Sequence, residues 1–405
     1  MNHIPNTYFI VLDALRSDHV KYMPWLSSKL NSGIYVKNIE ISSGFCERSE
    51  IFFSLKPKET GFLNAINIDI GLKSPNRPYY WFSYWPKSFL IFMEKNKFFQ
   101  KIIRRILWKI SIKKSFYGMY PQRIPLDILD KITLTEDAVD FEEYSNNIKS
   151  GLLYFFIKNG YHINWKYFTS LSNNSFGTDT SRLNHLLKHI ADYKNSFIPI
   201  YISSPDELGH KFGPHSNELV KALKILDEKL KFFYNSCIEN DSKSSICFLG
   251  DHGMEQVQEG INIEAIIHKI STDIGLKPQK DFYYFLDSTI LRIWWNSNNK
   301  NDFNKLYKAL ISHNKLQEKG YFINDKTFHD EGLPDLKEIA DIVWWAKKGI
   351  QINPDFFHSE HDLKAGMHGY LKKDDISSGF FLMLKENIIK KTYKKLEITN
   401  LSDIL

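Results

Sequence analysis

The chain has 405 residues, 43% of them hydrophobic and 25% charged, and its formal net charge is +6. These values are typical of a globular protein with a large core, and they exclude an intrinsically disordered chain. No apolar run reaches about 18 residues, which argues against a helix that spans a membrane.

The three cysteines, Cys46, Cys237 and Cys247, are too few for a disulfide framework, so we expect a reducing compartment. The first residues lack the charged start and apolar stretch of a secretory signal. We therefore expect a cytoplasmic protein. The sequence leaves its oligomeric state open.

An apolar run at residues 7–12, ended by Asp13, predicts a first buried strand. Similar runs predict strands at 34–41, 197–202, 245–249, 288–295, 341–346 and 379–383. Apolar residues at helical spacing and capping residues predict helices at 23–32, 49–55, 216–234, 261–274 and 303–312. Strands that alternate with helices indicate an α/β fold with a doubly wound, mainly parallel sheet. We expect one catalytic domain over residues 1–405, with a partly helical cap inserted at 62–190.

The positive charge is concentrated within that insert, at residues 81–120. This segment holds nine Lys or Arg and one acid, Glu94, a local charge of +8 that leaves −2 for the rest of the chain. Apolar residues at helical spacing lie between the basic ones, which predicts a basic amphipathic helix: Phe99, Ile102, Ile103, Ile106 and Ile110. Such a helix can contact an anionic membrane at the inner face, bind an acidic partner, or cover the core with a solvated basic face. We expect no nucleic acid, because no base-reading motif accompanies the charge.

Three of the expected strands end in acidic residues, and histidines follow. In open α/β sheets, ligands bind beyond the carboxyl ends of the strands. Three carboxylates and three imidazoles suit two divalent cations with about three protein ligands each, and a mixture of His and Asp favours zinc over magnesium. The six candidate ligands are Asp13, Asp206, His210, Asp251, His252 and His368.

The order of these residues resembles the nucleotide pyrophosphatase/phosphodiesterase branch of the alkaline phosphatase superfamily. The resemblance is carried by Pro-Asp206-x-x-Gly-His210-x-x-Gly-Pro214 and Gly-Asp251-His-Gly-Met254, with Asp13 before them and His368-Gly-Tyr370 after them. It covers residues 7–61, 195–256 and about 340–385. The resemblance implies an alkaline-phosphatase-like fold. It also implies one zinc on Asp206, His210 and His368, and another on Asp13, Asp251 and His252.

The turn before the helix at 49–55 departs from the family. The family places a nucleophilic Thr or Ser there, and an alignment without gaps gives Gly44. Cys46, as a thiolate, and Ser43 are the two candidate nucleophiles nearby, and each could instead be a small residue of the turn. Arg48 could hold a phosphoryl oxygen, or it could form an ion pair with Glu47 or Glu50. Formylglycine is not expected, because Cys46 lacks the Cys-x-Pro-x-Arg pattern.

The expected function is therefore two-zinc hydrolysis of a phosphodiester or phosphoanhydride, nucleotide-linked or lipid-linked, through a covalent intermediate. If neither Cys46 nor Ser43 reaches the metals, a water molecule activated by zinc would attack instead. Two alternatives remain open: a phosphotransferase of cell-surface polysaccharide synthesis, and a metal-binding relative with impaired catalysis.

Overall fold

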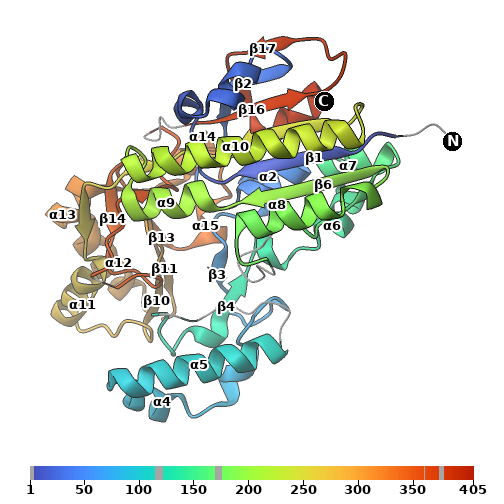
Figure 1. The fold of residues 1–405 in the computed structure, drawn as a ribbon. Helices are drawn as coiled ribbons and strands as arrows, with labels where there is room; N and C mark the ends of the chain where they lie inside the picture. Colours follow the sequence, from blue (N-terminus) through green and yellow to red (C-terminus); the bar gives the residue numbers. More distant parts are fainter. Residues whose placement is uncertain (1–3, 115–120, 122, 169–175, 360, 374–377) are drawn as a thin grey trace.

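The computed structural model describes residues 4–114, 121, 123–168, 176–359, 361–373 and 378–405. Within these residues, an eight-stranded sheet has the order β17-β2-β16-β7-β1-β6-β5, with β18 beside β2 (Figure 1). Only β16 runs antiparallel to its neighbours in this sheet. The predicted α/β fold with a mainly parallel sheet is confirmed. Its strands are β1 (Thr7–Leu12), β2 (Ile34–Glu40), β5 (His162–Ile163), β6 (Ser196–Ile202), β7 (Ser245–Gly250), β16 (Gly379–Leu384), β17 (Lys391–Tyr393) and β18 (Leu396–Glu397).

Both faces of the central sheet are covered. On β1, Tyr8, Ile10 and Leu12 pack in a core with one set of helices, while Phe9 and Val11 pack in a core with another. Because successive side chains of a strand point to opposite faces, a strand buried on both sides is apolar throughout. The first set is α1 (Pro24–Lys29), α8 (Asp179–Lys188) and α10 (Asn217–Asn240), and the second is α2 (Glu47–Phe53), α6 (Phe141–Ile148) and α7 (Gly151–Lys158).

A second, antiparallel sheet has the order β10-β11-β13-β12. Two strands expected from the sequence, at 288–295 and 341–346, belong to this sheet and not to the parallel one. Apolar runs alone cannot show which sheet a strand joins, because pairing depends on distant partners. The elements here are β10 (Phe282–Leu286), β11 (Ile290–Trp295), β12 (Gly320–Phe322) and β13 (Ile342–Ala346), with α11 (Ile263–Ile274), α12 (Lys300–Ile311), α13 (Asn314–Lys319), α14 (Asp325–Asp330) and α15 (Leu336–Ile339).

The interval 62–190 is divided between the two sheets. Its last part, α6 to α8, packs on the central sheet, and Phe156 of α7 stacks on Phe197 of β6. Its first part packs in the core of the second sheet and ends in a hairpin of two helices, far from the central sheet in Figure 1. These elements are β3 (Ile66–Ile68), α4 (Lys87–Glu94), α5 (Lys97–Lys114) and β4 (Ile132–Leu134). None of the helices in the described ranges is both long and apolar enough to cross a membrane.

Candidate metal centre

Three neighbouring strands carry four of the predicted ligands to one edge of the sheet. Asp13 follows β1, and Asp251 and His252 follow β7. Asp206 lies in the first turn of α9 (Ser204–Phe212), which begins directly after β6. Because β1 pairs in parallel with both β6 and β7, Leu12 stands opposite Ile202 and Gly250, and the three strand ends are adjacent.

Two further histidines complete the group. His210 follows Asp206 by one helical turn, so both side chains lie on the same face of α9. His368 follows β15 (Gly366–Met367), which pairs with β8 (Glu255–Gln256) just after the Asp251–His252 segment. This short pairing, between positions far apart in the chain, brings His368 to the strand ends.

The six predicted ligands form two triads in the structure. Asp13, Asp251 and His252 are buried and offer ligand atoms within 4.8 Å of one another. Asp206, His210 and His368 form the second triad under the same distance limit, and these residues are half-buried. The triads are neighbours, because the rings of His252 and His368 stack with centroids 4.3 Å apart. The structure therefore places all six residues as two adjacent sites.

The histidine tautomers fit metal binding. Nδ1 of His210 lies 2.8 Å from the carbonyl of Gly366, and Nδ1 of His252 lies 2.9 Å from the carbonyl of Gly253. A carbonyl accepts only from a protonated nitrogen, so Nε2 of a neutral ring is left with its lone pair. Such hydrogen bonds orient metal-binding histidines in known sites.

The free nitrogens face carboxylate oxygens. His210 Nε2 lies 3.1 Å from Asp206 Oδ1, and His252 Nε2 lies 3.2 Å from Asp13 Oδ1. Asp206 Oδ1 is buried and accepts no hydrogen bond from the described residues. Two lone pairs that face each other need a proton or a cation between them. The donor set of mixed imidazole and carboxylate therefore fits a divalent cation in each triad.

Burial and neighbouring charged groups shift the pKa values of the residues in both triads. Burial and the nearby Asp13 raise the pKa of Asp251 to about 8, although His252 acts in the opposite direction. Burial alone would lower the pKa of His252, but Asp251 and Asp13 raise it well above its usual value. Burial and the other two imidazoles lower the pKa of His368. Carboxylates packed this closely attract positive charge, whether a proton or a metal ion.

Main-chain and tyrosine hydrogen bonds hold the first triad. The amides of Ala14 and His252 donate to Asp251 Oδ1 at 3.1 and 2.9 Å. The hydroxyl of Tyr201 donates to Asp13 Oδ2. We did not predict Tyr201 from the sequence. Its only signal there is its position next to the end of β6, in register with Val11.

Gly44 lies at the triads but offers no nucleophile. It lines a cavity of about 360 Å³ together with His252 and His368. Its φ is +117°, and a Cβ at this position would lie 2.5 Å from the carbonyl oxygen of Leu63. The turn is pinned there, because the amide of Phe45 donates to the same oxygen at 2.9 Å. The backbone at Gly44 is thus built for glycine.

The two candidate nucleophiles are engaged elsewhere. Ser43 donates to Glu331 at 2.7 Å and accepts from the amide of Lys372 at 2.8 Å. Cys46 is buried, with its Sγ 3.9 Å from Thr135 Oγ1, and it belongs to neither of the two triads. It lies near the buried Arg292 of the second sheet, where burial lowers the pKa of the guanidinium while Asp287 and, to a smaller extent, Cys46 act in the opposite direction.

Arg48 lies beside two aromatic rings and close to two buried carboxylates. Its guanidinium lies 5.6 Å from the ring centroids of both Phe168 and Tyr201. Its charge favours ionisation of Asp13 and of the buried Glu136, whose pKa burial raises to about 8. Glu50 instead accepts hydrogen bonds from the amide and hydroxyl of Ser42. Glu136, which also accepts from the amide of Ser49, was not predicted from the sequence.

A second cavity opens on the other triad. It has a volume of about 640 Å³ and is lined by Asp206, His210 and His368, with Phe45, Lys211 and Lys364 around them. The ring of Phe45 meets His368 edge-on with centroids 5.3 Å apart. His368 lines both cavities, so it lies between the space beside His252 and the space beside Asp206 and His210.

Short stretches of the chain are similar to curated proteins. The venom phosphodiesterase of Macrovipera lebetinus is 38% identical over 63 residues, which cover 15% of this chain and 7% of the relative. GPI ethanolamine phosphate transferase 2 of Saccharomyces cerevisiae is 41% identical over 54 residues, or 13% and 6% of the two chains. The human ectonucleotide pyrophosphatase/phosphodiesterase family member 1 is 33% identical over 67 residues, 16% and 7%. The matches therefore span less than a tenth of each relative.

Solved structures resemble the whole chain. Murine ectonucleotide pyrophosphatase/phosphodiesterase 5 has a TM-score of 0.62 at 14% identity, covering 98% of this chain and 93% of that one. The human protein of the same name has a TM-score of 0.63 at 15% identity, covering 98% and 92%. At this identity the likeness establishes only the fold, which the chain shares with these two structures.

The family model for type I phosphodiesterase/nucleotide pyrophosphatase matches residues 107–371. This range is more than half of the chain and contains Asp206, His210, Asp251, His252 and His368. It leaves out Asp13 and the turn at Gly44, which the structure places beside the matched residues. The chain belongs to the type I phosphodiesterase/nucleotide pyrophosphatase family of the alkaline phosphatase superfamily.

Proposed function

We propose that this protein hydrolyses a phosphodiester or phosphoanhydride at a centre of two divalent cations. The observation that carries the proposal is the pair of adjacent Asp/His triads at the carboxyl edge of the parallel strands. Membership of the phosphodiesterase family supports the reaction class. Zinc fits a donor set of imidazole nitrogens and carboxylate oxygens better than magnesium, which prefers oxygen alone.

The chain supplies positions and charges for this reaction. When bound, such cations polarise phosphoryl oxygens and lower the pKa of a coordinated water. Tyr201 and the amide of Ala14 hold the carboxylates of Asp13 and Asp251, and the remaining oxygen of Asp13 faces Nε2 of His252. Gly44 leaves room for a small molecule beside His252 and His368.

We infer that a water molecule attacks the phosphorus. The alternative is a covalent intermediate on Cys46 or Ser43. It would require Cys46 to turn away from Thr135, or Ser43 to leave Glu331 and the amide of Lys372. Water needs no such rearrangement, and the cavity at Gly44 supports it.

For the substrate we propose a nucleotide-linked or lipid-linked phosphate ester. The venom relatives are named phosphodiesterases, and one structural neighbour is an inactive variant in complex with AMP. Of the two lysines that line the cavity beside the second triad, Lys364 pairs with Asp362 at 2.9 Å, and Lys211 is the one that could meet an anionic substrate.

Metal content and turnover test the proposal together. We expect about two zinc ions per chain by elemental analysis and hydrolysis of bis-p-nitrophenyl phosphate, both strongly reduced in Asp251→Asn. Glu228→Gln, which changes an exposed acid of α10, is the matched control and should change neither. A chain that binds no divalent metal contradicts the proposal. A chain that binds metal without turnover of any ester would identify an impaired relative.

A phosphotransferase is the second candidate. It is favoured by the stretch that is 41% identical to the yeast phosphate transferase. The two reactions differ in the group that receives the phosphoryl unit. Reaction in water enriched in ¹⁸O separates them, because hydrolysis adds one heavy oxygen to the product and transfer to an alcohol adds none.

We further propose a reducing, cytoplasmic location. Cys46, Cys237 and Cys247 are all buried and none of them is in a disulfide, which agrees with a protein that needs no disulfide. Cell fractionation checks this proposal, and recovery with extracellular proteins would contradict it.

A further inference from the structure

The hairpin of α4 and α5 carries the basic segment at an end of the molecule away from the central sheet (Figure 1). One side of α5 faces inward: Leu107 is buried, and Arg104 bonds to Glu94 of α4 at 2.7 Å and to the carbonyl of Ile124. Ile103 and Ile110 pack against the core of the second sheet. These contacts fix the orientation of the helix, and therefore which residues face outward.

The outward side of α5 is apolar along one stripe. Phe98 is 67% exposed, and Ile102 and Ile106, each four residues further on, are 39% and 45% exposed. Of the five apolar residues that the sequence predicts on this helix, three are therefore exposed: Phe99, Ile102 and Ile106. On α4, Phe89 and Phe92 are 60% and 65% exposed. An uncovered group of large apolar side chains of this kind marks an interaction surface.

A basic stripe runs beside the apolar one. Three exposed basic residues follow one another at a spacing of four: Lys101, Arg105 and Lys109. Each is either next in sequence to an exposed apolar residue or three residues from one, so the two stripes are adjacent on the helix. Lys97, at the start of α5, is exposed as well. None of these four side chains forms an ion pair with a described residue. The acid nearest to them in sequence, Glu94, forms its ion pair with Arg104. Their charge is available to a partner.

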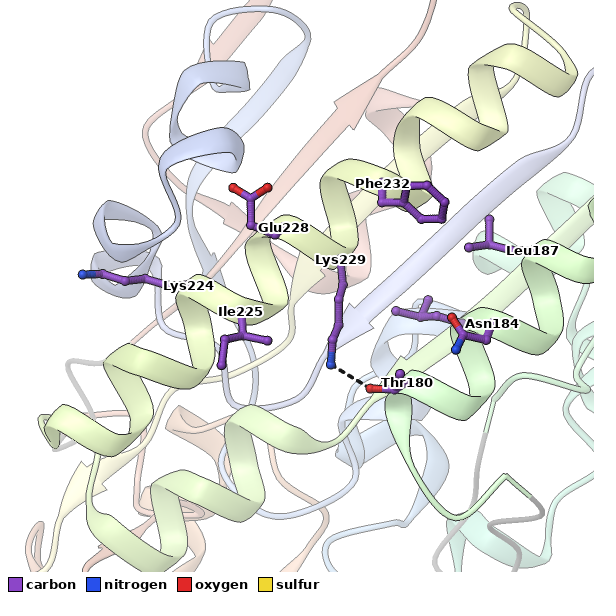
Figure 2. A pocket seen from close by; sticks show the side chains of 9 residues that line it. Thr180, Asn184, Leu187, Lys224, Ile225, Glu228, Lys229 and Phe232 are labelled. Carbon is purple, nitrogen blue, oxygen red and sulfur yellow. Dashed lines mark hydrogen bonds between the residues drawn. The ribbon is translucent and has the colours of Figure 1, made fainter.

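The groove between α8 and α10 is a second exposed apolar surface, with which the hairpin can be compared (Figure 2). Ile225 and Phe232 are 60% and 64% exposed there, as much as the hairpin aromatics. Its charges are mixed, with Glu228 between Lys224 and Lys229, and Lys229 donates to Thr180 at 2.7 Å. Exposure alone therefore does not distinguish the hairpin. The unpaired basic stripe beside bulky apolar side chains does.

We propose that the α4–α5 hairpin binds the surface of an anionic lipid bilayer. The apolar side chains would enter the boundary between headgroups and acyl chains, while Lys97, Lys101, Arg105 and Lys109 contact anionic headgroups. An acidic protein would match the charge, but it would not account for aromatic side chains that project from both helices. The inference rests on this surface alone and is independent of the reaction at the metal centre.

Vesicle sedimentation with the full chain tests the inference. We expect binding to phosphatidylcholine vesicles with about 30% phosphatidylglycerol, weak binding to pure phosphatidylcholine, and loss of binding at about 0.5 M salt. Lys101→Glu with Arg105→Glu should lower the partition coefficient by about tenfold or more. Phe92→Ser with Phe98→Ser should lower it by a similar factor, because two buried apolar groups are lost.

Matched variants on α10 are the controls. Ile225→Ser with Phe232→Ser removes side chains of similar exposure, and Lys221→Glu with Lys224→Glu reverses two exposed charges. Both should bind vesicles as the wild type does. Equal binding to neutral and anionic vesicles would overturn the inference, as would hairpin variants that bind normally. Salt-dependent capture of an acidic protein or an oligonucleotide, lost in the hairpin variants while vesicles are not bound, would overturn it in favour of that partner. Thermal melts verify that each variant is folded.

Discussion

The metal centre and the turn at residues 42–48 lie side by side, yet they relate differently to their family. The centre has all six ligands predicted from the sequence, and the structure assembles them into two triads. In the turn, Gly44 has no side chain and no room for one beside the carbonyl of Leu63, Ser43 donates to Glu331, and Cys46 lies beside Thr135. The comparison shows that the strand ends can retain the predicted metal ligands while the side chains of the adjacent turn contact other parts of the fold.

Removal of a metal ligand should have the largest effect. His252→Ala removes an imidazole from the buried triad, and we expect a loss of bound metal and a fall in activity of about a hundredfold or more. Metal analysis and turnover of bis-p-nitrophenyl phosphate measure both. His215→Ala, at an exposed position, is the control and should keep both. Full metal content in His252→Ala would show that the triad is not a ligand set.

Restoring a side chain at the turn should harm the protein. Gly44→Thr introduces the hydroxyl of the family, but φ is +117° and the new Cβ would meet a backbone carbonyl at 2.5 Å. We expect a loss of about 3 kcal/mol in the free energy of unfolding and no gain in activity. Urea denaturation measures the loss.

Gly61→Ala is the control for the backbone effect. Its φ is +73°, and no atom lies within 4 Å of the new Cβ, so only the conformational cost of about 1 kcal/mol should remain. A stable and more active Gly44→Thr protein would contradict our assignment of the turn.

Acid should lower the free energy of unfolding through His19, a buried imidazole in the segment after β1. Burial lowers the pKa of this imidazole from its usual 6.5 to about 4. The unfolded chain therefore binds more protons between these values, so stability is complete above pH 6.5 and falls as the pH decreases toward 4. Between pH 7 and pH 5, the free energy of unfolding should fall by about 2 kcal/mol less in His19→Gln than in the wild type.

Denaturation at the two pH values measures this difference. The exposed His329→Gln control should keep the wild-type dependence. An unchanged pH dependence in His19→Gln would show that other groups cause the loss. The result also shows whether a loss of activity at low pH comes from unfolding or from loss of metal at the centre.

Substitution of the two candidate nucleophiles should have the smallest effect. Because Cys46 and Ser43 contact Thr135 and Glu331 and not the triads, Cys46→Ser and Ser43→Ala should change kcat by less than about threefold. Steady-state kinetics measure kcat, and mass spectrometry of quenched reactions should detect no phosphorylated chain. A hundredfold loss in either variant would establish the covalent route and would make the turn part of the reaction.

The sequence by itself predicted the long strands of the central sheet, β1, β2, β6, β7 and β16, and the six candidate ligands that the structure brings together. Each of Asp13, Asp206, Asp251 and His252 comes directly after, or within one helical turn of, a buried apolar strand, so its position on the sheet edge follows from local pattern. His210 follows from its spacing of four residues to Asp206. The departure at Gly44 was also visible, because a missing side chain can be read from a single position.

Only the tertiary structure decided the features that depend on distant contacts. Tyr201 and Glu136 reach the site through the register of β6 and the position of α2, and neither residue stands in a motif. The strands at 290–295 and 342–346 pair with each other in a second sheet. On α5, the sequence showed an apolar face, but only the packing of Leu107 and Arg104 revealed that Phe98, Ile102 and Ile106 remain exposed. Local pattern sets which residues are apolar or charged, whereas distant partners set which of them are covered.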